Sequence, residues 1–246
     1  MNKLYTNGYS AINLYKKTSS ESEIVTQMIY GEDFKIINKF SNWMKIKIKN
    51  DGYVGYIKNK KFFSYFKTTH KISVLSANIY RNSNFNKKIG KLAYTSKLKI
   101  EKTTSKFSKF QGQWIETKNI KPIKYKNKNI FKDIGIFKNI KYKWGGKTFN
   151  GIDCSALIQV CLNYNNIFCP RDTVQQVKFF KRNINLKNIK KNDIIYWKRH
   201  VALALSGKKL IHAYGPRKKT LIMDIQKTIK LIKRTTNLNV VVVKRV

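Results

Sequence analysis

Residues 142–164 read YKWGGKTFNGIDCSALIQVCLNY, and this stretch decides how the C-terminal half of the chain folds. Its first five residues, Tyr142 to Gly146, indicate a turn into a packed element. After Asp153, apolar side chains recur with the spacing of a buried helix face. Asp153 itself is a suitable N-cap for that helix. Cys154 is therefore expected in the first helical turn, where unpaired backbone N–H groups and the helix dipole favour a thiolate.

Two of the three histidines in the chain, His200 and His212, follow Cys154 in sequence. They fall on apolar runs at 200–205 and 209–214, which predict neighbouring antiparallel strands joined by a short turn. Residue parity does not decide whether both histidines face one side, because the register of the turn is not fixed by the sequence. A cysteine nucleophile needs a base, and the base needs a third group that orients it. The three residues are thus the parts of a Cys-His-His hydrolase.

Five motifs in this half resemble, in order and spacing, the NlpC/P60 cysteine peptidase family. They are Tyr-x-Trp-Gly-Gly at 142–146, Gly-Ile-Asp-Cys-Ser at 151–155, Cys-Pro-Arg-Asp-Thr at 169–173, His-Val-Ala at 200–202 and Ile-His-Ala at 211–213. The similarity is closest to the branch with bacterial SH3 domains, the γ-D-glutamyl-L-diamino acid dipeptidyl peptidases. It extends from about Tyr142 to about Ile225.

The resemblance implies a role for each matching residue. Cys154 is expected as the nucleophile, His200 as the general base and His212 as the group that orients His200. Tyr142 is expected to line the site and to help stabilise the oxyanion. Asp172 matches an acidic residue that holds the free ammonium group of an N-terminal L-alanine, a role compatible with capping the helix that follows. Further expected pocket residues are Asp153, Ser155 and Thr173.

The N-terminal half predicts two small β-barrels, because short alternating runs divided by polar turns occur twice. The expected domains are SH3-like barrels at 1–66 and 67–128 and a peptidase domain at 129–246. The second barrel is the more diverged, since it lacks the Gly-Tyr-x-Gly signature of residues 52–55. The predicted fold class is α+β, with a papain-like core in which a helix packs on an antiparallel sheet. Residues 131–140 fit either a linker or a first helix of the peptidase domain.

In the branch that this sequence resembles, residues of the first barrel close one end of the cleft, so that only peptides with a free N-terminal alanine fit. Tyr53 and Glu32 lie where such contacts would originate. A phenol and a carboxylate beside Asp172 would suit a buried ammonium group. The alternative is that Tyr53 belongs to the barrel core and Glu32 to a turn.

The formal net charge of +40 points to anionic partners at first sight. The lysines, however, are spread along every segment, and asparagine and isoleucine are abundant as well, a composition typical of A/T-rich codons. No specific nucleic acid partner is therefore expected. A positive field would still attract wall peptides, which carry several carboxylates.

The cysteines and the first residues bear on the compartment. Cys161 and Cys169 are expected as small buried side chains, and Cys154 and Cys161 lie about two helical turns apart, too far to bridge. This is no disulfide framework, which fits a reducing compartment. Met1–Gly8 contains no apolar segment typical of a signal peptide, and no run is long enough to cross a bilayer. A cytoplasmic location without membrane insertion is expected.

The resulting prediction is a cysteine peptidase that cleaves the γ-D-glutamyl–diamino acid amide of murein peptides with a free N-terminal L-Ala, in peptidoglycan recycling. No metal or cofactor is expected, because no cluster apart from the triad has metal-ligand spacing. One alternative is an extracytoplasmic endopeptidase that acts on intact wall. The other is a non-enzymatic basic SH3 protein that binds an anionic polymer. The preferred diamino acid and the oligomeric state stay open.

Overall fold

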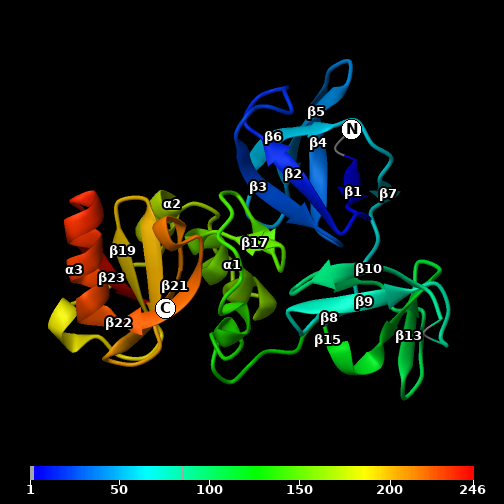
Figure 1. The fold of residues 1–246 in the computed structure, drawn as a ribbon. Coiled ribbons are helices and arrows are strands. Elements are labelled where there is room, and N and C mark those ends of the chain that lie inside the picture. The colour runs from blue at the N-terminus through cyan, green and yellow to red at the C-terminus, as the bar shows by residue number, and fades with distance from the viewer. Residues whose placement is uncertain (1–2, 85) are drawn as a thin grey trace. The chain divides into compact units, whose positions relative to one another are not determined.

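The computed structural model describes residues 3–84 and 86–246, which divide into two compact units (Figure 1). The first unit comprises residues up to Lys126 together with Lys147–Phe149, and the second comprises Asn127–Gly146 and Asn150–Val246. The first is built from β-strands, and the second combines helices with an antiparallel sheet, which confirms the α+β class. The expected boundary at 128/129 falls close to the division at Lys126. No sequence pattern indicates that residues 147–149 group with the first unit.

The first part of the N-terminal unit is a seven-stranded antiparallel sheet with the order β3-β2-β6-β5-β4-β1-β7. Three of its strands, at 11–15, 43–48 and 54–58, bury every second residue, and Leu14, Phe34, Ile46 and Ile57 are completely buried in one core. The strands are β1 (Leu4–Thr6), β2 (Ala11–Tyr15), β3 (Ile24–Ile29), β4 (Asp33–Lys39), β5 (Trp43–Ile48), β6 (Val54–Lys58) and β7 (Phe63–Ser64).

The second part of this unit contains a five-stranded sheet, β10-β9-β14-β13-β12, and a three-stranded sheet, β11-β8-β15. Tyr30, just after β3, joins the core of this part and meets Phe110 edge-on, with ring centroids 5.8 Å apart. Gly31 has φ +78°, and a Cβ there would lie 2.0 Å from the Lys97 carbonyl oxygen, so only glycine fits. The strands are β8 (His70–Ile72), β9 (Ser76–Tyr80), β10 (Lys88–Ala93), β11 (Lys97–Leu98), β12 (Lys102–Thr103), β13 (Phe107–Phe110), β14 (Gln113–Glu116) and β15 (Ile120–Pro122).

The second unit is organised around a six-stranded antiparallel sheet with the order β18-β23-β19-β20-β21-β22. Strands β19 and β20 are joined by a two-residue turn in which Arg199 has φ +62°. The strands are β18 (Arg182–Ile184), β19 (Asp193–Trp197), β20 (His200–Ala204), β21 (Lys209–Tyr214), β22 (Lys219–Asp224) and β23 (Val240–Arg245). This unit also contains the two-residue strand β17 (Gly151–Ile152), whereas β16 (Lys147–Thr148) belongs to the first unit.

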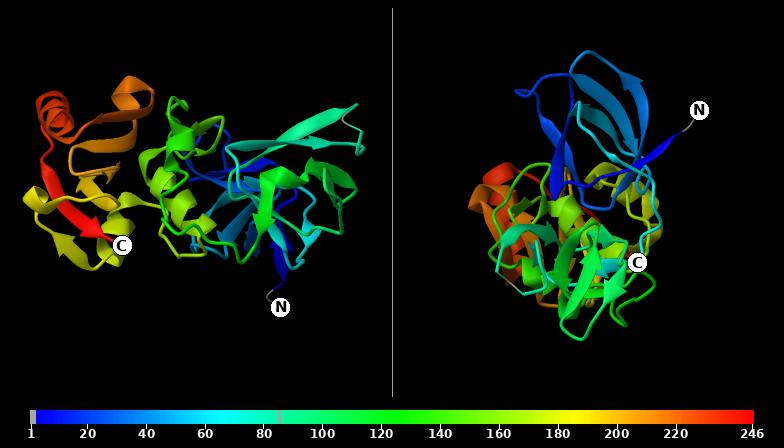
Figure 2. Two further views of the ribbon diagram at one scale, coloured as in Figure 1. Left: turned by 90° about the horizontal axis from the view of Figure 1, so that it is seen from below. Right: turned by 90° about the vertical axis from the view of Figure 1, so that its right-hand side faces the viewer.

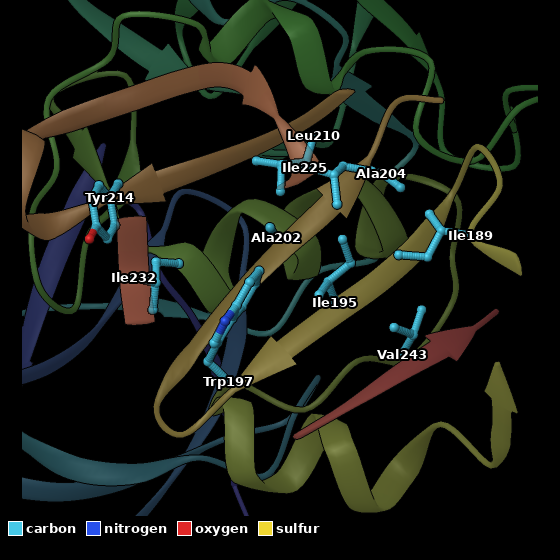
Figure 3. Close-up of a cluster of buried hydrophobic side chains, with 10 residues drawn as sticks. All are labelled: Ile189, Ile195, Trp197, Ala202, Ala204, Leu210, Tyr214, Ile225, Ile232 and Val243. Carbon is cyan, nitrogen blue, oxygen red and sulfur yellow. The ribbon is translucent and has the colours of Figure 1, made fainter. Parts of the chain in front are cut away.

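Helices cover both faces of this sheet (Figures 1 and 2). Helix α1 (Cys154–Tyr164) contacts β20 and β21, α2 (Thr173–Phe179) follows it, and α3 (Ile225–Thr236) lies on the opposite face. Figure 3 shows the core beneath α3, where Ile225 and Ile232 meet apolar side chains of the sheet. The segment that fitted either a linker or a helix contains the 3₁₀ helix Ile134–Phe137, whose two end residues are buried in this unit.

In the described part of the chain, no helix is both long and apolar enough to cross a membrane.

Candidate active site

Cys154 is the first residue of α1, as its position after an N-cap residue predicts. The Asp153 side chain caps the helix by accepting a hydrogen bond from the Ala156 N–H at 2.8 Å. The Cys154 Sγ lies 4.0 Å from the Arg199 carbonyl oxygen. Burial raises the pKa of Cys154 to about 12, and hydrogen bonds from the backbone N–H groups of Val201 and Ser155 offset only part of that rise. The resting group is therefore a thiol rather than the thiolate that the helix position alone favours.

A buried arginine holds the residue before the cysteine. Arg171 donates from Nη1 to Asp153 Oδ1 at 3.0 Å and to Ser155 Oγ at 2.8 Å, and from Nη2 to Asp153 Oδ2 at 2.5 Å. Asp153 also accepts from the Gly145 N–H at 2.9 Å, which ties the turn after Tyr142 to the helix start. The side chains of Asp153 and Ser155, both expected in the pocket, are thus engaged inside the protein. Their contact with a substrate stays a prediction.

Sequence reasoning missed Arg171. Its side chain is only 1% exposed. The signal was its place in Cys-Pro-Arg-Asp-Thr, between residues of a packed element. Because arginine is rarely buried unless it is paired, that place indicates an acidic partner inside the protein. Its charge lowers the pKa of Cys154, whereas Asp153 raises it, so the two nearly adjacent charges act on the thiol in opposite directions.

The strand register brings the two histidines together. Strands β20 and β21 pair Leu203 with Ile211, and this register puts His200 and His212 on the same face, two residues apart diagonally. His200 Nε2 and His212 Nδ1 are 2.9 Å apart. This contact settles the question that residue parity left open.

Aromatic rings enclose this histidine pair. The Tyr214 ring stacks on His212 with centroids 4.8 Å apart and 11° between the planes, and Trp197 lies 5.6 Å from the His200 ring. Burial lowers the pKa of His200 to about 4 and, together with the neighbouring His200, that of His212 to about 3. Both imidazoles are therefore neutral at pH 7, and His200 is able to accept a proton.

Tyr142 lies beside the cysteine. It forms a parallel β-bridge with Ile152, and its ring packs against Gly215. Burial, and then the negative charge that Cys154 would carry, raise the pKa of the Tyr142 phenol. The phenol therefore stays protonated at neutral pH and can donate to an oxyanion near Cys154. That role stays a prediction.

Asp172 and Thr173 stand at the start of α2. Asp172 occupies the N-cap position, yet its side chain makes no capping hydrogen bond, and it is half-buried. The Thr173 side chain is buried. Asp172 thus stands at the N-cap without a side-chain capping hydrogen bond, and the substrate contacts of Asp172 and Thr173 stay predictions.

Tyr53 and Glu32 belong to the first unit. Glu32 is buried, with Oε1 2.6 Å from Lys147 Nζ and Oε2 accepting from the Ile29 N–H at 2.8 Å. Tyr53 is half-buried and packs against the core of the first barrel. Tyr53 thus packs in the barrel and the Glu32 carboxylate is paired with Lys147, and the substrate contacts of both residues stay predictions.

Cys161 and Cys169 are completely buried, Cys161 within α1 and Cys169 in the loop before α2. Over residues 3–84 and 86–246, no group of three or more His, Cys, Asp or Glu side chains could hold a metal ion.

The second unit thus holds a thiol at a helix N-terminus and two neutral imidazoles 2.9 Å apart. These are the groups that a cysteine hydrolase would use as its nucleophile, its base and the residue that orients the base. Residues 139–237 match the model of the NlpC/P60 family, and residues 14–62 match that of the bacterial dipeptidyl-peptidase Sh3 domain. The chain contains an NlpC/P60 domain and, before it in sequence, a bacterial SH3 domain.

Two curated relatives match most of the chain. Dipeptidyl-peptidase 6 of Lysinibacillus sphaericus is 24% identical over 228 residues, which are 82% of this chain and 84% of that protein. Gamma-D-glutamyl-L-lysine dipeptidyl-peptidase of Bacillus subtilis is 23% identical over 236 residues, 85% of this chain and 79% of that protein. The crystal structure of an NlpC/P60 family protein from Bacillus cereus has a TM-score of 0.84 at 16% identity, covering 98% of this chain and 99% of that one. This likeness shows that the fold is shared.

Proposed function

We propose that this chain is a cysteine peptidase that hydrolyses the γ-D-glutamyl–diamino acid amide of murein peptides with a free N-terminal L-Ala. The observation that carries the proposal is the Cys154–His200–His212 constellation, with the two imidazoles 2.9 Å apart. The proposed substrate class is supported by the names of two relatives that match most of the chain, dipeptidyl-peptidase 6 and gamma-D-glutamyl-L-lysine dipeptidyl-peptidase.

The chemistry begins from neutral groups. Because burial raises the pKa of Cys154 and lowers that of His200, both groups are neutral before the reaction. The thiol proton therefore moves to His200 at the same time as the sulfur attacks the amide carbon, and not before it. The backbone N–H groups at the start of α1 and the Tyr142 phenol stabilise the oxyanion that forms. His200 then gives its proton to the leaving amine of the diamino acid. Water, deprotonated by His200, hydrolyses the thioester and regenerates the thiol.

Asp172 provides the charge that selects a free N-terminus. It is half-buried, and a carboxylate in that position binds an ammonium group far better than an acylated nitrogen. A requirement for free L-Ala restricts the enzyme to peptides already released from the glycan, which makes peptide recycling in the cytoplasm the proposed context. The cysteine pattern fits that compartment, since Cys154 and Cys161 lie in one helix, two turns apart. Fractionation of cells that produce the protein tests the location, and recovery from the wall or the medium would contradict it.

The test is cleavage of L-Ala-γ-D-Glu-meso-diaminopimelate and L-Ala-γ-D-Glu-L-Lys, followed by mass spectrometry, with N-acetylated copies in parallel. Wild type is expected to cleave only the free peptides, and Cys154→Ala is expected to lower kcat at least about a thousandfold. Equal cleavage of free and acetylated peptides would refute the ammonium pocket and favour intact wall as the substrate. No cleavage, together with retention on an anionic polymer at physiological salt, would favour the non-enzymatic alternative.

A further inference from the structure

His212 has a partner at each ring nitrogen. Its Nδ1 lies 2.9 Å from His200 Nε2, and its Nε2 lies 3.4 Å from Met223 Sδ. Met223 is on β22, where Leu221 pairs with His212, so the methionine is two residues further along the same face. The His212 side chain is completely buried.

The sulfur fixes which His212 nitrogen carries the proton. A thioether has lone pairs but no hydrogen, so it accepts and never donates. The contact is attractive only when His212 Nε2 carries the hydrogen. Burial keeps the His212 imidazole neutral, with its pKa lowered to about 3, so a ring protonated at Nε2 has a bare Nδ1. Nδ1 then accepts from His200.

The same constraint passes to His200. Its Nε2 must carry the hydrogen that His212 accepts, and its Nδ1 is left with a lone pair. Nδ1 is the ring nitrogen nearer the backbone, and the Cys154 Sγ contacts the backbone on both sides of His200, at the Arg199 carbonyl and the Val201 N–H. The lone pair is therefore on the nitrogen that has to take the thiol proton.

The opposite arrangement is inactive. With the hydrogen on His212 Nδ1, that nitrogen would donate to His200 Nε2, and the His200 hydrogen would move to Nδ1. His200 could then no longer accept the thiol proton at Nδ1. At the same time the His212 Nε2 lone pair would face the lone pairs of the Met223 sulfur, which repel it.

We propose that Met223 is a positioning residue that selects the reactive tautomer of His200 by accepting a hydrogen bond from His212. The contribution to turnover rests on the proposed peptidase function, whereas the contribution to the tautomers does not. The proposed role of the Met223 sulfur is to accept a hydrogen bond from His212 and not to bind the substrate. Loss of this acceptor is therefore expected to leave KM unchanged.

The test compares three variants by nitrogen-15 spectroscopy of the imidazoles and by peptide cleavage. Protonated and bare ring nitrogens have well-separated shifts, and the chain has only three histidines, with His70 as an internal reference. Met223→Leu keeps the volume and removes the acceptor. It is expected to give mixed tautomers at His212 and His200 and to lower kcat about tenfold at unchanged KM, a loss of about 1.4 kcal/mol.

Met223→Glu supplies an acceptor that cannot donate when ionised. Lys227, Lys230 and Arg234 line the same surface groove as Met223 and favour a carboxylate there. This variant is expected to restore the wild-type tautomers and most of kcat. Met44→Leu, in the core of the first barrel, is the matched control for the chemical change and is expected to behave as wild type.

Unchanged tautomers in Met223→Leu, with kcat within twofold of Met44→Leu, would overturn the inference. A shift of tautomers in Met223→Leu that Met223→Glu reverses would support it even if the wild type cleaves no murein peptide. In that event the proposed substrate fails and the positioning role stands, so the two failures are distinguishable.

Discussion

Replacing Arg171 by methionine should destabilise the start of helix α1 more than a substitution at the protein surface would. The substitution removes a guanidinium that makes three hydrogen bonds of 2.5–3.0 Å to Asp153 and Ser155. Asp153 keeps the Ala156 and Gly145 N–H donors, but its charge is left without a counter-ion at 5% exposure. Breaking a buried ion pair in this way costs about 3–5 kcal/mol of stability. Since two backbone N–H groups still donate to the Asp153 carboxylate, we expect a loss at the lower end of that range, about 3 kcal/mol.

A double-mutant cycle separates the ion pair from packing. Asp153→Asn in the Arg171→Met background removes the stranded charge while its side-chain oxygen still caps α1, so the double variant should be more stable than Arg171→Met alone. The expected coupling energy is about 2 kcal/mol. Hydrogen exchange of the α1 amides along a urea titration follows the second unit without interference from the first.

The same variant should slow the reaction. Arg171 lowers the pKa of Cys154 and Asp153 raises it, so loss of the arginine leaves only the unfavourable charge.

A destabilisation below about 1 kcal/mol, or a coupling energy near zero, would show that the Arg171–Asp153 contact is not what holds the helix start, and the reasoning above would be refuted.

Two further predictions follow from other buried groups. Because burial lowers the pKa of His200 to about 4, kcat/KM of wild type should persist at pH 5 and fall only as pH approaches 4, and an acid limb near 6.5 in a pH–rate profile would contradict this. Lys147→Met should destabilise the first unit by about 3–5 kcal/mol, because it strands the Glu32 carboxylate that lies 2.6 Å from the lysine at 6% side-chain exposure. Glu32→Gln combined with Lys147→Met should recover part of that loss in urea unfolding, and an additive double variant would show that the two side chains do not interact.

The sequence alone determined the features that depend on neighbouring residues. Strands β20 and β21 occupy the predicted runs at 200–205 and 209–214, because continuous apolar runs are local properties. Helix α1 begins at Cys154 because Asp153 is a local capping signal. The candidates for nucleophile and base, Cys154 and His200, were likewise readable from motifs with fixed spacing.

Tertiary structure decided which distant groups meet. The register of β20 and β21 places His200 beside His212, and a slip of one residue would have put them on opposite faces. The Lys147–Glu32 and Arg171–Asp153 pairs join residues 115 and 18 positions apart. Met223 gains its contact with His212 only through the pairing of β21 with β22. These partners, and the burial that sets the pKa values of Cys154 and His200, arise from long-range packing, which no local pattern encodes.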